Sequence, residues 1–165
     1  MRTKLEQWRA LAPGERRLLV QLAAQLPLTG AMLRLLGFRR THRLLSLSGG
    51  ATTEQGGEVS AASWIAAKRV ARLVSIASRH GPYRPTCLRQ SLVLWQTLRR
   101  RGLPAQLRIG VGRPDGRMVA HAWVELGERV VNERPSIGAD YAAYAHLDPP
   151  PRDPRNGQRL SAQRR

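Results

Sequence analysis

The sequence contains few acidic side chains, few aromatic side chains and only one cysteine. Its 165 residues include 28 Lys and Arg against 11 Asp and Glu, a formal net charge of +17, and aromatic residues make up 5%. With Cys87 alone, the chain cannot form an internal disulfide bond. The four histidines are scattered and no CxxC or HExxH spacing is present, so no metal site is expected.

Long apolar runs are also missing. Polar residues and Pro27 interrupt the Leu- and Ala-rich stretch from residue 18 to 36 before it reaches about 20 apolar residues. It is therefore not expected to span a membrane, and membrane contact by the N-terminal helices is not favoured. Residues 1–11 alternate polar and apolar positions in helical fashion and do not resemble a signal sequence. These features predict a cytoplasmic protein.

The excess of positive charge has several interpretations. It would suit nucleic acid, an anionic membrane or an acidic peptide as partner. The charge is almost all arginine and is spread along the chain, as a compositionally biased genome would also produce. Stacking aromatics do not interleave the basic residues, so a nucleic-acid partner is not expected.

Length and hydrophobic content favour one domain with irregular ends. Residues 1–47 are predicted to form an amphipathic helical segment, in which Pro27 is expected to separate the helices Glu15–Leu26 and Leu28–Phe38. Residues 48–58 are rich in Gly, Thr and Ser and predict a flexible connection. Residues 59–135 are predicted to form the core, and residues 136–165 an irregular, Pro- and Arg-rich tail.

Within the core the hydrophobic period changes from helix to strand. Helices are expected at residues 60–79, capped by Ser60, and at residues 87–101, between Thr86 and Gly102. Residues 105–111, 118–126 and 129–132 then alternate with the period of strands, separated by turns. The pattern predicts an α+β fold, with helices packed on a small antiparallel sheet.

Cys87 is the candidate nucleophile because it begins the second core helix. A helix N-terminus favours a thiolate and offers backbone N–H groups to a carbonyl oxygen that gains negative charge. His121 is the one histidine expected mid-strand in the following sheet, whereas His42, His80 and His146 are expected in connections.

The imidazole of His121 needs an acceptor for its second nitrogen, and hairpin register offers two. If residues 126–128 form a three-residue loop, Glu133 lies directly opposite His121. A two-residue loop instead aligns Trp123 with Asn132, sends Glu133 to the other face and makes Asn132 the orienting group. We favour Glu133, because the first register also pairs opposite charges.

Four segments carry a combined signal: residues 86–95 (TCLRQSLVLW), 100–105 (RRGLPA), 120–125 (AHAWVE) and 130–133 (VVNE). Together they resemble the lasso-peptide leader peptidases, the transglutaminase-like and papain-like half of the lasso-peptide biosynthesis B protein. The similarity also covers residues 8–40 and 64–79, and so nearly the whole chain up to residue 135. The Cys-His-Asp triad of that family falls on Cys87, His121 and Glu133, where this sequence has Glu in place of Asp.

The resemblance implies a cysteine peptidase that cuts the leader from a ribosomally made precursor peptide and needs no cofactor. A separate ATP-dependent cyclase then closes the macrolactam ring of the core. The family also uses a small leader-recognition protein of winged-helix-like fold, and no such domain precedes residues 1–43, so a separate partner is implied.

Two alternative functions remain open. The same triad could transfer the acyl group to an amine, as an acyltransferase or transglutaminase does. A protein without catalytic activity could instead use its basic surface to bind an acidic peptide, RNA or a membrane.

Overall fold

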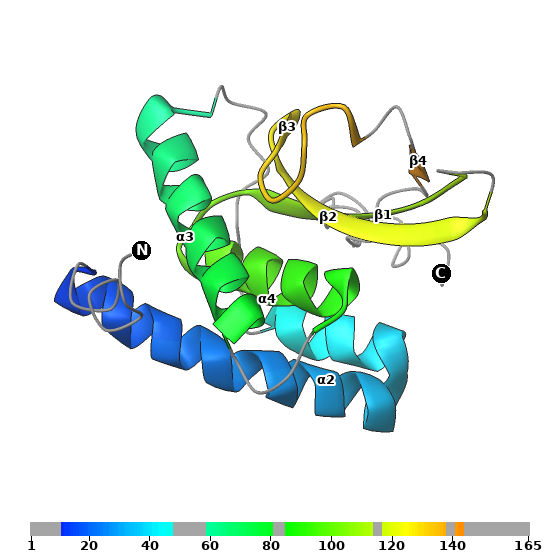
Figure 1. Ribbon diagram of the computed structural model, residues 1–165, viewed down its shortest axis with the longest axis horizontal. Coiled ribbons are helices and arrows are strands. Elements are labelled where there is room, and N and C mark those ends of the chain that lie inside the picture. Colours follow the sequence, from blue (N-terminus) through cyan, green and yellow to red (C-terminus); the bar gives the residue numbers. More distant parts are fainter. Residues whose placement is uncertain (1–10, 48–58, 81–84, 114–116, 138–140, 144–165) are drawn as a thin grey trace, which may run out of the picture.

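Three helices pack on one small sheet in the computed structural model, which describes residues 11–47, 59–80, 85–113, 117–137 and 141–143 (Figure 1). The order is α2 (Pro13–Leu47), α3 (Ala61–His80), α4 (Cys87–Arg100), β1 (Ala105–Gly112), β2 (Val119–Leu126), β3 (Arg129–Val130) and β4 (Tyr141–Ala143). The strands form one antiparallel sheet in the order β3-β2-β1-β4. This is the predicted α+β arrangement. The predicted connection at residues 48–58 lies outside the described residues.

Helix α4 is the centre of the molecule, between the sheet and α2 (Figure 1). Every residue from Ser91 to Leu98 is buried, and the indole of Trp95 is fully enclosed. The helix starts after Thr86, which has extended backbone angles and whose carbonyl accepts the N–H of Gln90. It ends before Gly102, whose positive φ of 75° suits a helix C-terminus. Both predicted ends are correct to within one residue.

Helix α3 packs against both α2 and α4. Ser60 caps it as predicted, because its hydroxyl accepts the N–H of Ser63 at 3.1 Å. The helix turns Val70, Leu73 and Val74 into the core.

The predicted break at Pro27 is wrong. Pro27 lies inside α2, where the buried neighbours Leu26 and Thr29 keep the helix packed on the core. The helical angles are instead interrupted at Gly37 (φ 73°, ψ 173°), a conformation that glycine adopts without steric cost. Figure 1 shows the blue and cyan parts of α2 turning back on each other there. The packing of this helix on the core therefore outweighs the loss of the backbone hydrogen bond that a proline cannot donate.

The hairpin register is the two-residue alternative, and the favoured three-residue loop is wrong. Glu125 pairs with Val130 and Leu126 with Arg129, so only Gly127 and Glu128 form the turn. Gly127 has a positive φ of 62°, which permits so tight a turn. The N–H of Val131 still donates to the carbonyl of Val124 at 2.9 Å, and then the chain leaves the ladder.

Two further expectations are wrong. The tail from residue 136 is not all irregular, since β4 pairs with β1 and Ile137 and Tyr141 are buried against Trp123. His42 does not lie in a connection: it is buried in α2, with its ring stacked on Trp95 at 4.7 Å. His80 ends α3, and His146 lies outside the described residues.

Candidate functional site

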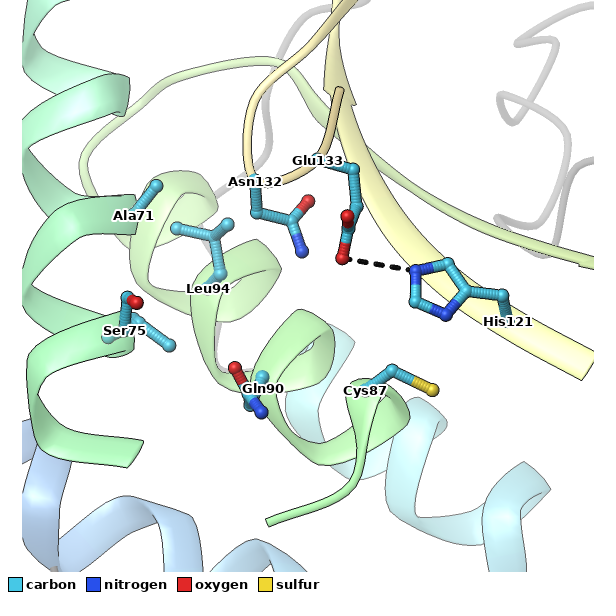
Figure 2. Close-up of a pocket in the computed structure, with 9 residues that line it drawn as sticks. Ala71, Ser75, Cys87, Gln90, Leu94, His121, Asn132 and Glu133 are labelled. Atoms are coloured by element: carbon cyan, nitrogen blue, oxygen red, sulfur yellow. Dashed lines mark hydrogen bonds and ion pairs between the residues drawn. The ribbon is translucent and has the colours of Figure 1, made fainter. Parts of the chain in front are cut away.

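A cavity of about 280 Å³ lies where α3, α4, β2 and the segment after β3 meet (Figure 2). It brings together the three residues that the sequence predicted as catalytic. The lining residues are Ala71, Val74, Ser75, Cys87, Gln90, Leu94, His121, Asn132 and Glu133.

Cys87 is the first residue of α4 and is half-buried. Figure 2 shows its sulfur on the side of the cavity where His121 lies. The first turn of a helix has backbone N–H groups without intrahelical partners, and Gln90 is the first residue here whose N–H bonds back to the preceding turn. The thiol therefore lies beside the backbone N–H groups of the first helical turn and the positive end of the helix dipole.

His121 is held by Glu133 through one ring nitrogen. Nε2 of His121 lies 3.1 Å from Oε1 of Glu133, and the two side chains are 20% and 34% exposed. An ionised carboxylate can only accept, so a neutral imidazole that bonds to it donates through Nε2–H and keeps Nδ1 as its acceptor. In Figure 2, Nδ1 lies on the side of the ring that faces Cys87. The imidazole is thus oriented to take a proton from the cysteine side of the cavity.

Asn132 lines the same cavity but does not hold His121. Its Oδ1 accepts the N–H of Val124 at 2.8 Å, and its Nδ2 donates to the hydroxyl of Ser91 at 3.2 Å. The Ser91 hydroxyl in turn donates to the carbonyl of Ala122 at 2.9 Å. These three bonds, which we call the Ser91–Asn132 clasp, join α4, β2 and the segment that carries Glu133.

Aromatic and charged groups support the other side of His121. Its ring lies 5.4 Å from that of Tyr141 and 6.4 Å from that of Trp123, measured between centroids. The indole N–H of Trp123 donates to Glu125 at 2.8 Å, and Arg108 binds the second oxygen of Glu125 at 2.8 Å. The imidazole is therefore packed on a platform that is itself fixed by hydrogen bonds.

Comparison with known families agrees with this architecture. Residues 32–147, well over half of the chain, match the family described as the transglutaminase-like superfamily. The chain belongs to the transglutaminase-like superfamily. No curated protein and no solved structure matches the sequence.

Membership confirms the predicted fold class and gives the broad chemistry. Proteins of the transglutaminase-like superfamily are typically cysteine-dependent enzymes and include cysteine peptidases and acyltransferases. Among the residues that the structure describes, no group of three or more His, Cys, Asp or Glu side chains could hold a metal ion.

The sequence predicted Cys87, His121 and Glu133, which line one cavity in the structure, but it did not predict much of what holds them in place. Ser91 is a polar residue within an apolar helical stripe, four residues after Cys87, and that position was the available signal. Tyr141 lay in a segment predicted as coil, where only three residues form the strand. Its place beside His121 depends on pairing with β1, which lies far away in the sequence.

Proposed function

We propose that the protein is a cysteine peptidase that cleaves the leader from a ribosomally made lasso-peptide precursor. The single observation that carries the proposal is the cavity in which a helix-start cysteine meets a histidine oriented by a carboxylate. The choice of substrate is supported by the sequence resemblance of residues 86–95, 100–105, 120–125 and 130–133 to the lasso-peptide leader peptidases.

The reaction would begin with proton transfer from Cys87 to Nδ1 of His121. The thiolate attacks the carbonyl carbon at the leader–core junction and forms a C–S bond, and the carbonyl π electrons move to oxygen. The backbone N–H of Cys87 is suited to donate to that oxyanion. The imidazolium then gives its proton to the departing core amine as the C–N bond breaks.

A thioester between Cys87 and the leader remains after this first half. His121 accepts a proton from water, the hydroxide equivalent attacks the thioester, and the C–S bond breaks to release the leader acid. The thiol of Cys87 regains the proton. Glu133 keeps the ring in place and stabilises its charged form in both halves.

The partners in this proposal are the precursor peptide, a separate leader-recognition protein and, downstream, a lasso cyclase that uses the released core. No cofactor takes part in the steps above. Nothing in the mechanism requires nucleic acid, and we place the reaction in the cytoplasm, where the precursor is made.

To test the proposal, the full chain is incubated in H₂¹⁸O with the precursor peptide whose gene lies nearby, with and without the leader-recognition protein. Mass spectrometry should find free core and a leader acid that has gained one ¹⁸O. Cys87→Ala and His121→Ala should each lower cleavage by about 10³-fold or more. Wild-type cleavage by Cys87→Ala would refute the proposal.

The same experiment separates the rival functions. The superfamily also includes acyltransferases, and transfer to an amine would give a leader that carries the mass of the amine and no ¹⁸O. A binding module without catalysis would give no product, and its Cys87 would not react with iodoacetamide near neutral pH. Either result would replace the peptidase assignment.

A further inference from the structure

The outer face of α2 is unusually apolar for a surface helix. Nine large apolar side chains are exposed among the described residues, and six of them lie on this one helix. The six, with their exposed fractions, are Val20 (59%), Leu28 (60%), Leu35 (82%), Leu36 (38%), Leu44 (47%) and Leu47 (77%).

The exposed residues form a continuous stripe at helical spacing. Val20, Ala24, Leu28, Ala31 and Leu35 follow one another at intervals of three or four, and all are exposed. No charged residue occurs between Arg17 and Arg34. A stripe of more than four turns therefore carries no charge, and Gln21 is the exposed polar residue beside it.

The charges that border this stripe have one sign. Arg17 precedes the stripe in the sequence, and four exposed arginines follow it on the two sides of the kink at Gly37: Arg34, Arg39, Arg40 and Arg43. Glu15 is the single acidic residue of α2, against six arginines. Leucine on one face with flanking arginine is the composition of a helix that lies in the interface of an anionic membrane.

The buried face of α2 shows whether the helix could lie on a membrane or cross it. By length and composition alone α2 would be long and apolar enough to cross. Its inner residues Leu19, Leu22 and Leu26, however, are buried against the core formed with α3 and α4. The helix can therefore rest on a lipid surface with one face, but it could not span the bilayer without leaving its own core.

We propose that α2 docks the protein on an anionic lipid surface through the stripe from Val20 to Leu35 and the arginines around Gly37. The catalytic cavity is lined from α3, α4, β2 and the segment after β3, and the sheet lies on the other side of α4 from α2 (Figure 1). Docking therefore leaves the cavity open. The proposal stands independently of which peptide the site cleaves.

Net charge alone would attract this protein to anionic vesicles, so the test must change apolar contact without changing charge. The full chain is mixed with vesicles of phosphatidylcholine containing 30% phosphatidylglycerol, or of phosphatidylcholine alone, and binding is measured by flotation. Leu28→Gln with Leu35→Gln should weaken binding to the anionic vesicles at least tenfold. Ile65→Gln, which alters an exposed apolar residue on α3, is the matched control and should bind as wild type.

Insertion is checked with an environment-sensitive dye on cysteine. Cys87→Ala removes the only native thiol, so Leu35→Cys or Ile65→Cys can carry the label alone. The label at position 35 should shift to the blue and be quenched by spin-labelled lipid, and the label at position 65 should not.

Three outcomes would overturn the proposal. Unchanged vesicle binding by the double glutamine variant would mean attraction by charge only. No binding by the wild-type chain would mean that this face meets something other than lipid. Sedimentation showing an oligomer that the glutamine substitutions dissociate, without vesicle binding, would assign the face to self-association.

Discussion

At the residue scale, His121 has a different neighbour on each side of its ring. Nε2 faces the carboxylate of Glu133 and Nδ1 faces the side of the cavity with Cys87. The His121–Glu133 pair is partly exposed, so its contribution to stability is small. Its value lies in fixing the tautomer and the plane of the imidazole.

Replacing Glu133 should affect turnover far more than folding. Glu133→Ala is expected to lower kcat by about 10²–10⁴-fold, because the ring loses its orienting acceptor. Glu133→Gln should retain more activity than Glu133→Ala, since an amide oxygen can still accept from Nε2–H. Steady-state kinetics on the precursor measure both.

The control for this series is Glu128→Ala, which removes an exposed carboxylate in the turn before β3. It should leave kcat within about twofold. If Glu133→Ala were as active as Glu128→Ala, the orienting role of Glu133 would be wrong.

At the scale of elements, the Ser91–Asn132 clasp fixes how α4 and β2 meet. Ser91 lies one helical turn after Cys87, Ala122 is next to His121, and Asn132 precedes Glu133. Ser91, Ala122 and Asn132 are therefore each adjacent in the chain to a proposed catalytic residue, or one helical turn away from it. We infer that the clasp positions all three.

Ser91→Ala should destabilise the protein by about 1–3 kcal/mol, because a buried carbonyl and an amide lose their partner. Asn132→Ala should cost a similar amount, and the double variant less than the sum, because the two side chains share one bond. Urea unfolding measures these free energies. The control is Ser63→Ala, near the start of α3, which should change the free energy of unfolding by less than about 0.5 kcal/mol. If the losses of the Ser91→Ala and Asn132→Ala variants were strictly additive in the double variant, the two side chains would not share a network.

Gly110 of β1 gives a second prediction at this scale. A Cβ there would lie 2.9 Å from the Trp123 ring and 3.0 Å from both Tyr141 Cβ and the Ala142 carbonyl. Gly110→Ala should therefore displace the platform beneath His121, cost about 1–3 kcal/mol and lower kcat. Gly14→Ala, where nothing lies within 4 Å, should do neither. Thermal unfolding and kinetics on the two variants make the comparison.

At the scale of the whole molecule, α2 belongs to the same core as the candidate site. Leu19, Leu22 and Leu26 pack in one hydrophobic cluster with α3, α4 and the sheet. The N-terminal segment is thus part of the folded unit, even though its outer face is free of contact with that core.

Leu22→Ala and Leu28→Ala should differ in their cost to stability, because Leu22 lies on the buried face of α2 and Leu28 on the exposed face. Leu22 is fully buried, so its truncation is expected to cost about 2–5 kcal/mol. Leu28 is 60% exposed, and its truncation should cost less than about 0.5 kcal/mol. Chemical denaturation of both variants tests the packing, and equal losses would contradict it.

The amino-acid sequence by itself determined the elements whose signals are local. Caps and helical periodicity placed α3 and α4 within a residue or two, alternation placed β1 and β2, and the start of α4 put Cys87 at a helix N-terminus. These features depend on neighbours a few residues apart, which the chain displays directly.

Only the tertiary structure decided how the site closes. From the two-residue turn alone, Asn132 would have been expected to orient His121. The strand pairing ends after Val131, however, and the Asn132 amide bonds to Val124 and Ser91 instead. Glu133 is therefore the residue that bonds to the imidazole. The break at Gly37 and the pairing of β4 likewise depend on packing between distant segments. Whether such contacts form depends on how much surface is buried and which hydrogen bonds are made across the whole fold. A local sequence pattern does not contain that information.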